Sequence, residues 1–243
     1  MKKIIGVVPA ASLGDMTKSN MSDHYKILNN YVKRAAEAGC VPIGMAPVDY
    51  WLSEEAMDLC DGFLVQGGAE FYPYHFQIMH HVFTHGKRYL GICLGSQLIY
   101  TYLALRKMVE ERGYEGDDIV KAICDLREEK GPEFSVLQAV EGHRSAAMTR
   151  GGEDAAKHDV NVVPGTLLHR VAGTDTLRMA SFHYLQVPPE QELVTINSWS
   201  AKGDGVVEGV EYGDRILGIQ AHPEVDDLLP QVFDFLNWDD QTK

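Results

Sequence analysis

Short apolar runs alternate along this chain with segments whose apolar positions recur at helical spacing. Such alternation predicts an α/β fold, a three-layer α/β/α sandwich whose central, mostly parallel sheet has helices on both faces. The predicted helices span residues 24–38, 54–59, 74–85, 95–107 and 228–238. The predicted strands span residues 3–8, 41–45, 62–65, 88–92, 135–140, 159–163, 193–197, 205–212 and 215–221.

The composition changes over residues 110–133, which hold nine acidic side chains. A stretch this rich in charge is either an exposed helix with charged flanks or a partly mobile insertion. No repeat, low-complexity linker or clear boundary interrupts the rest of the chain. We therefore expect one domain over residues 1–243, with residues 110–133 as an acidic insertion.

Charge and cysteine usage narrow the classes of partner. The net charge of −13 argues against nucleic acid or an anionic membrane surface as the main partner. No apolar run approaches the roughly 20 residues needed to span a bilayer, and the N-terminal residues do not resemble a signal peptide. The four cysteines are far apart and form no CxxC pair, so we expect free thiols and a cytoplasmic location.

The strongest chemical signal is the segment Tyr89-Leu90-Gly91-Ile92-Cys93-Leu94-Gly95-Ser96-Gln97-Leu98. A glycine lies two residues before Cys93 and another two residues after it, between a predicted strand and a predicted helix. This pattern is typical of a nucleophile elbow, in which a strained turn holds the sulfur at a helix N-terminus that favours negative charge. The Leu94 N–H then points to where an oxyanion would form. By itself the motif fits equally well a buried cysteine that acts as a small hydrophobe.

Two other segments supply the groups that a nucleophilic cysteine needs. His222 and Glu224 follow a predicted strand and are two residues apart, so in an extended strand they would share a face. A histidine can take and return the proton, and a carboxylate can orient the imidazole. Gln66-Gly67-Gly68 follows another strand, and such a turn can offer a backbone N–H to an oxyanion. A surface turn and an ordinary glycine turn are the alternatives for these two segments.

Taken together, these motifs resemble the class I glutamine amidotransferase-like superfamily, whose fold is flavodoxin-like. Within it the sequence is most similar to the peptidase C26 branch, which includes γ-glutamyl-γ-aminobutyrate hydrolases. The resemblance covers almost the whole chain. It rests on Glu37-Ala38-Gly39-Cys40-Val41-Pro42, Asp61-Gly62-Phe63-Leu64-Val65-Gln66-Gly67-Gly68, Pro164-Gly165-Thr166-Leu167, Ser181-Phe182-His183, Asp204-Gly205-Val206-Val207-Glu208 and Gly218-Ile219-Gln220-Ala221-His222-Pro223-Glu224.

The resemblance implies a division of roles among these residues. Cys93, His222 and Glu224 would form a catalytic triad that passes through a γ-glutamyl thioester on Cys93. The backbone N–H groups of Gly68 and Leu94 would form the oxyanion hole. The glutamyl pocket would be lined by Gln97, Ser181, Phe182 and His183, with His183 a pocket-lining or structural histidine rather than a second base.

The chain departs from the branch on the side where the leaving group would lie. Leu94 and Ser96 replace the arginine and methionine usual after the nucleophile in the γ-glutamyl-γ-aminobutyrate hydrolases. Tyr184-Leu185 replaces the double histidine of that branch, and its glutamine is displaced to Gln186. Leu94 is more typical of the glutamine amidotransferases proper. The leading hypothesis is a cysteine-nucleophile hydrolase of γ-glutamyl amides or peptides. The alternative is a glutaminase subunit that acts with a separate synthetase, and a third possibility is a non-catalytic module that binds a glutamyl metabolite.

Cofactors and metals are not expected. No Walker-type phosphate loop is present, so nothing suggests an ATP site that would activate an ammonia acceptor. His75, His80, His81 and His85 cluster in sequence, but they lack an HExxH pattern and an obvious third ligand, so a solvated helix is expected there. The expected partners are a small γ-glutamyl substrate, a second copy of the chain in a homodimer and, under the alternative, a synthetase.

Overall fold

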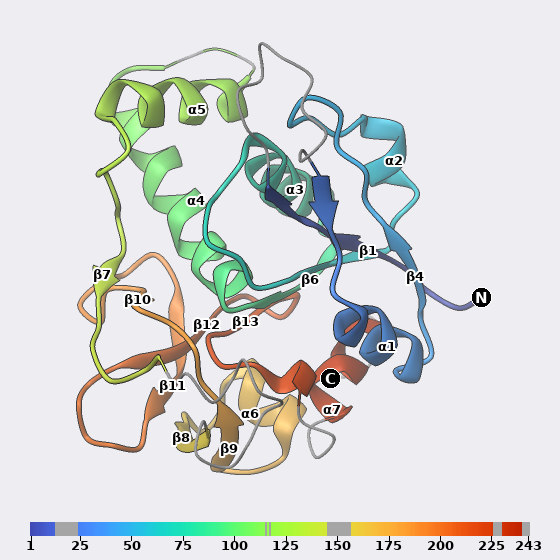
Figure 1. The fold of residues 1–243 in the computed structure, drawn as a ribbon, viewed down its shortest axis with the longest axis vertical. Helices are drawn as coiled ribbons and strands as arrows, with labels where there is room; N and C mark the ends of the chain where they lie inside the picture. The colour runs from blue at the N-terminus through green and yellow to red at the C-terminus, as the bar shows by residue number, and fades with distance from the viewer. Residues whose placement is uncertain (13–23, 115, 117, 145–156, 226–229, 240–243) are drawn as a thin grey trace.

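A nine-stranded sheet crosses the molecule (Figure 1) in a computed structural model that describes residues 1–12, 24–114, 116, 118–144, 157–225 and 230–239. Five neighbouring strands are parallel, and four antiparallel strands extend the sheet from the last of them. The parallel strands, in order across the sheet, are β4 (Val41–Gly44), β1 (Ile4–Val8), β5 (Gly62–Val65), β6 (Arg88–Ile92) and β13 (Ile216–Ile219). The antiparallel strands that follow are β12 (Val207–Tyr212), β11 (Thr195–Ser200), β8 (Lys157–Val162) and β9 (Thr176–Ala180).

Helices cover both faces of this sheet, which explains why β5, β6 and β13 are buried along their whole length. One face carries α2 (Glu54–Asp58), α3 (Pro73–His85), α4 (Leu94–Glu111) and α5 (Ile119–Lys130). The other carries α1 (Asn29–Glu37), α6 (Leu167–Ala172) and α7 (Pro230–Asp234). Each set of helices encloses a separate hydrophobic core against the sheet. The predicted fold class is confirmed.

Residues 24–38 do not form one helix, as the spacing of their apolar residues predicts. His24–Lys26 form strand β3, which pairs with β2 (Ala10–Ser12), and the helix begins only after Leu28. Leu28, expected on the buried face, is 40% exposed at the helix start. The strand pairing at β2 is a contact between distant residues, and it overrides the local helical periodicity.

The acidic stretch 110–133 is built into the fold. Its first residues complete α4, and α5 packs on α3 and α4 with Val120, Ile123 and Leu126 buried in the core. Of the two alternatives for this stretch, the helix is therefore found, but one of its faces is buried. The acidic side chains occupy its outer face, where Lys121 pairs with Asp125 and Arg112 pairs with Glu129.

The second half of the chain differs most from its predicted elements. The strand predicted over residues 135–140 is reduced to β7 (Gln138–Ala139), which pairs with β10 (Leu185–Gln186) outside the main sheet. The last predicted helix is a short α7 followed by a 3-10 turn, Phe235–Asn237. Strand β9 and helix α6 were not predicted. None of the helices in the described part of the chain is long and apolar enough to cross a membrane.

Candidate active site

Cys93 lies at the junction between β6 and α4, in a backbone conformation that side chains rarely adopt. Its φ of 52° and ψ of −105° place it outside the regions favoured by residues with a Cβ. The Cys93 N–H donates to the Ile219 carbonyl of β13 at 2.8 Å, which holds the strained turn against the sheet. The side chain consequently projects at the N-terminus of an 18-residue helix, where the helix dipole favours a negatively charged sulfur.

The two glycines of the elbow are required by close packing. A Cβ on Gly91 would overlap the Gly95 carbonyl, and a Cβ on Gly95 would overlap the Val65 carbonyl of the neighbouring strand β5. Neither glycine has a positive φ, so space rather than backbone conformation excludes larger residues at both positions. The elbow therefore depends on the contact between α4 and β5 as much as on its own turn.

His222 and Glu224 form a direct hydrogen-bonded pair beside Cys93. The imidazole Nδ1 donates to Glu224 Oε1 at 2.7 Å, and both side chains are buried. This contact does not come from an extended strand, as the two-residue spacing predicts, because Pro223–Val225 form a 3-10 turn that folds the carboxylate back onto the ring. His222 Nε2 has no hydrogen-bond partner among the described residues and remains available to the Cys93 sulfur.

The surroundings of His222 favour its charged form. Burial alone would lower the pKa of His222, but the negative charges of Glu224 and of the Cys93 sulfur outweigh burial and raise it well above its ordinary value. A histidine held in this way keeps a proton that it can hand to a leaving group. Its backbone is fixed as well, because the His222 N–H donates to the Ala180 carbonyl at the end of β9 at 2.8 Å.

Tyr31 of α1 is a further member of this group that sequence reasoning missed. Its hydroxyl donates to Glu224 Oε1 at 2.8 Å and accepts the Gly67 N–H at 3.1 Å. The ring is almost completely buried, and burial together with the Glu224 charge raises the pKa of Tyr31 well above its ordinary value. The only sequence signal was an apolar position on the face of a helix, which does not distinguish a polar contact from core packing.

The turn after β5 approaches the same sulfur. A Cβ on Gly67 would lie 3.0 Å from His222 Cε1 and 3.4 Å from Cys93 Cβ. A Cβ on Gly68 would lie 2.9 Å from the Leu94 side chain. The structure thus brings Gly68 and Leu94, the two residues predicted to donate backbone N–H groups, into contact beside Cys93.

A cavity of about 800 Å³ opens in front of the sulfur. Gln97, Phe182 and His183, which were predicted to contact substrate, line it, but Ser181 does not. Ser181 is buried behind the wall, where its hydroxyl donates to the His143 carbonyl at 3.2 Å. Gln97 is oriented by two contacts of its amide nitrogen, which donates to the Leu185 carbonyl and to Gln220 Oε1.

Two arginines add positive charge to this cavity. Arg127 of α5 donates to the Phe71 carbonyl at 3.0 Å and lies over the Phe76 ring, and Arg144 lies over the Phe182 ring. Neither forms an ion pair with a carboxylate of the described residues. Arg127 belongs to the acidic stretch 110–133. Because negative charge dominates that stretch, the sequence did not predict that Arg127 would line the cavity.

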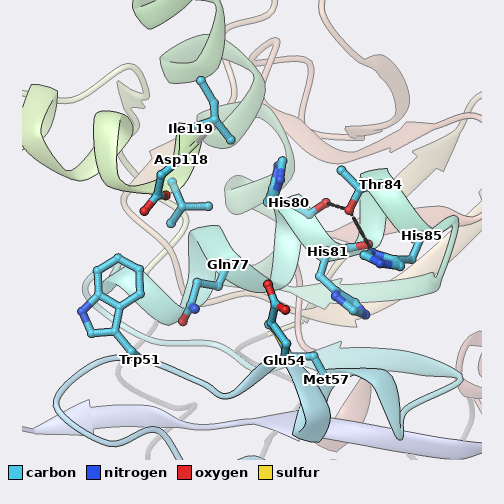
Figure 2. Close-up of a pocket in the computed structure, with 11 residues that line it drawn as sticks. Trp51, Glu54, Met57, Gln77, His80, His81, Thr84, His85, Asp118 and Ile119 are labelled. Carbon is cyan, nitrogen blue, oxygen red and sulfur yellow. Dashed lines mark hydrogen bonds between the residues drawn. The ribbon is translucent and has the colours of Figure 1, made fainter. Parts of the chain in front are cut away.

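Figure 2 shows a second cavity, of about 530 Å³, between α2, α3 and the start of α5. His80, His81 and His85 lie along it, with the rings of His81 and His85 stacked 4.1 Å apart. The prediction of a solvated helix here is wrong, because His75 and His81 are buried. Burial lowers the pKa of His75 to about 3 and that of His81 to about 4, so both rings are neutral at ordinary pH.

Comparison with known sequences gives the same family as the motifs. The family model described as glutamine amidotransferase class-I matches residues 20–228. CTP synthases from two strains of Halobacterium salinarum are each 25% identical in an alignment over 233 residues, and the match covers 90% of this chain. The match covers 39% of those proteins, so the chain spans about two fifths of the length of the curated relatives it matches.

Solved structures share the fold at low sequence identity. The glutaminase domain of Trypanosoma brucei CTPS with bound acivicin is 16% identical, with a TM-score of 0.64 over 97% of this chain and 92% of that one. A Thermoplasma acidophilum protein described as a component of GMP synthase is 18% identical, with a TM-score of 0.58 over 97% and 93%. These similarities support the three-layer architecture around the elbow.

Proposed function

The chain belongs to the class I glutamine amidotransferase family, and on that premise we propose that it hydrolyses the side-chain amide of L-glutamine with Cys93 as the nucleophile. Among the two enzyme hypotheses raised by the sequence, this is the glutaminase alternative. The relatives support it over the leading hypothesis, since the curated proteins are CTP synthases and a structural neighbour is a glutaminase domain. Leu94 after the nucleophile points in the same direction.

Each residue around the Cys93 sulfur has one role in the proposed reaction. The Cys93 sulfur attacks the amide carbon, and the oxyanion that forms accepts hydrogen bonds from the Gly68 and Leu94 N–H groups. His222 gives its proton to the departing nitrogen, so ammonia leaves as the carbon–sulfur thioester forms. Water then attacks the thioester and loses its proton to His222, which frees glutamate and restores the thiolate. Glu224 keeps the imidazole oriented throughout.

The observation that carries this proposal is the convergence of three separate chain segments on one sulfur. Cys93 sits in a strained elbow at φ 52°, and His222 and Glu224, hydrogen-bonded to each other at 2.7 Å, lie beside it. Gly67 approaches so closely that a Cβ there would lie 3.4 Å from Cys93 Cβ. Strain of this kind costs about 1–3 kcal/mol and persists where the surrounding structure holds it in place for function. A cysteine that served only as a small hydrophobe would need neither the strain nor the base.

A second candidate function is the hydrolysis of γ-glutamyl amides that carry a larger, acidic amine. The cavity of about 800 Å³ exceeds what ammonia as a leaving group requires, and Arg127 and Arg144 offer two cations without carboxylate partners among the described residues. Pockets of this size accommodate small-molecule ligands well beyond a single amino acid. A leaving amine with a carboxylate would fit those cations, and its release would be one case of the γ-glutamyl amide or peptide hydrolysis that was the leading hypothesis from the sequence.

The deciding experiment measures glutamate release from L-glutamine and from a panel of γ-glutamyl amides, with mass spectrometry of protein quenched during turnover. We expect a γ-glutamyl adduct on Cys93, faster release from glutamine than from the larger amides, and no release by Cys93→Ala. A matched control is Cys124→Ala, which removes a half-buried thiol of α5 that is not among the residues lining the cavity. Release from glutamine that Cys93→Ala leaves unchanged would overturn the proposal.

Partners and organisation complete the proposal. A separate synthetase would receive the ammonia, and glutaminase activity that rises only when this partner is added would support that arrangement. A single domain over residues 1–243, a cytoplasmic location and a homodimer are the remaining expectations. Limited proteolysis, cell fractionation and sedimentation of the full chain test them in turn.

A further inference from the structure

Three histidines surround one buried carboxylate at the end of the sheet beyond the active-site cavity. His143 Nδ1, His158 Nε2 and His183 Nε2 lie 2.9, 2.8 and 3.6 Å from Glu208 Oε1. None of these four side chains is more than 10% exposed. The residues come from four segments far apart in sequence, so only the fold assembles them.

The outer contacts of two rings determine where their protons are. His143 Nε2 lies 2.9 Å from Asp204 Oδ2, and His183 Nδ1 lies 3.0 Å from the Leu185 carbonyl oxygen. Carboxylates and carbonyls accept hydrogen bonds, so the ring nitrogen must donate in both contacts. In a neutral imidazole the other nitrogen then carries a lone pair, and both lone pairs face Glu208.

Such an arrangement is repulsive unless something positive lies between the rings and the carboxylate. His143 Nδ1 has no hydrogen bond of acceptable geometry in spite of its 2.9 Å approach, and His183 Nε2 and Glu208 Oε2 have none either. Buried polar atoms without partners are costly, at about 1–3 kcal/mol each. Three of them converge here, and all belong to groups that bind metals.

The geometry points to a zinc site, and we propose that His143 Nδ1, His158 Nε2 and the Glu208 carboxylate, whose ligand atoms all lie within 4.8 Å of one another, bind one Zn²⁺. Ligand atoms at zinc–ligand distances of about 2.0–2.2 Å in a tetrahedron lie about 3.3–3.5 Å from one another. His143 Nδ1 and His158 Nε2 lie 2.9 and 2.8 Å from Glu208 Oε1, about 0.5 Å closer than that value. Imidazole and carboxylate ligands suit zinc, and the Asp204 contact orients the His143 ring as outer partners of metal ligands do.

The charges of this group also balance. With the rings neutral, the ionised carboxylates of Glu208 and Asp204 together carry the charge that one Zn²⁺ neutralises, without a buried net charge. The alternative without a metal requires protons on the rings instead. The two arrangements differ in metal content, which can be measured directly.

The site would hold one wall of the active-site cavity in place. The chain from the end of β9 to His183 makes two contacts with the active site. The Ala180 carbonyl accepts the His222 N–H, and the Phe182 carbonyl lies 3.9 Å from Cys93 Sγ. Glu208 also contacts the segment that leads from β13 to His222, because its backbone carbonyl accepts the Gln220 N–H at 2.8 Å. A metal at Glu208 therefore anchors both sides of His222, in a structural rather than catalytic role.

The test is elemental analysis of the purified full-length protein after zinc loading and dialysis. We expect one zinc per chain in the wild type, and less than about a tenth of that in His158→Gln and in Glu208→Gln. His85→Gln is the matched control, since His85 belongs to a second group, with the exposed Asp58 and the buried His81, which could also attract a metal. Zinc should raise the melting temperature of the wild type and of His85→Gln by roughly 5 °C or more, and should leave the other two variants unchanged.

Cobalt substitution covers the case in which the variants fold poorly. The chelated wild type, supplied with Co²⁺, should develop the visible absorption of tetrahedral nitrogen–oxygen coordination, and added Zn²⁺ should bleach it. A wild type with substoichiometric zinc and no such absorption would overturn the proposal, as would full zinc occupancy in folded His158→Gln or its loss in His85→Gln. Glutaminase activity is not the readout, so loss of activity through Cys93 leaves this test unaffected.

Discussion

The substitution Tyr31→Phe tests whether helix α1 positions the Glu224 carboxylate, which we propose orients His222. It removes one oxygen atom from a ring that is 1% exposed and leaves the shape of the core unchanged. Two hydrogen bonds disappear with that oxygen, one donated to Glu224 Oε1 at 2.8 Å and one accepted from the Gly67 N–H at 3.1 Å. Glu224 retains its 2.7 Å contact with His222, so the triad is loosened rather than broken.

The magnitude follows from these two bonds. A hydrogen bond to a charged acceptor contributes about 1.5–3 kcal/mol, and an amide left without a partner costs about 1–3 kcal/mol. Because part of the second loss is recovered by local relaxation, we expect the free energy of unfolding to fall by about 2–4 kcal/mol. For kcat/KM we expect a loss of roughly tenfold, equivalent to about 1.4 kcal/mol of transition-state stabilisation.

Urea unfolding and glutaminase kinetics measure the two effects on the same preparations. The control is Tyr102→Phe, which deletes a buried hydroxyl of α4 that bonds the neutral His80 ring at 2.9 Å, away from the active site. It should lose about 1 kcal/mol of stability and no activity. A Tyr31→Phe protein within about 0.5 kcal/mol of the wild type and fully active would refute the reasoning.

Three further predictions concern the elbow, the base and the acidic stretch. Gly95→Ala should cost about 1–3 kcal/mol or more, seen as a lower melting temperature, because the new Cβ would overlap Val65; a neutral change would contradict the packing argument. Burial lowers the pKa of His222, and the charge of Glu224 is the largest of the influences that raise it. The stability due to that raised pKa is present below about pH 6.5 and is lost as pH rises through the higher folded value. Glu224→Gln should therefore shift the alkaline limb of the pH–rate profile to lower pH, and an unmoved limb would exclude this role. Ile123→Ala should destabilise by about 2–5 kcal/mol in denaturant melts, whereas a loss below 1 kcal/mol would make α5 peripheral.

The strands at the centre of the sheet and the residues of the candidate active site could be predicted from the sequence because both depend on local signals. Strands β5 and β6 match their predicted bounds at both ends, since buried parallel strands are short apolar runs bounded by turn residues. The glycines around Cys93 predict a strained turn. The segment His222-Pro223-Glu224 predicts a base with its orienting carboxylate. Residue type alone predicted that chemistry, and the expectation of a glutamyl substrate followed from the family resemblance.

Contacts between distant segments were decided only by the tertiary structure. Pairing of β3 with β2 replaced the first turns of a predicted helix, and Tyr31 reached Glu224 across 193 positions of the chain. The grouping of His143, His158 and His183 around Glu208 was not predicted, although His183 and Glu208 belong to segments of the family resemblance, because spacing along the chain is unrelated to separation in space. Periodicity reports which face of an element is apolar, but it cannot report which residues meet across a sheet. For this protein the sequence predicted a nucleophile and a base, and only the packing showed which residues hold them in place.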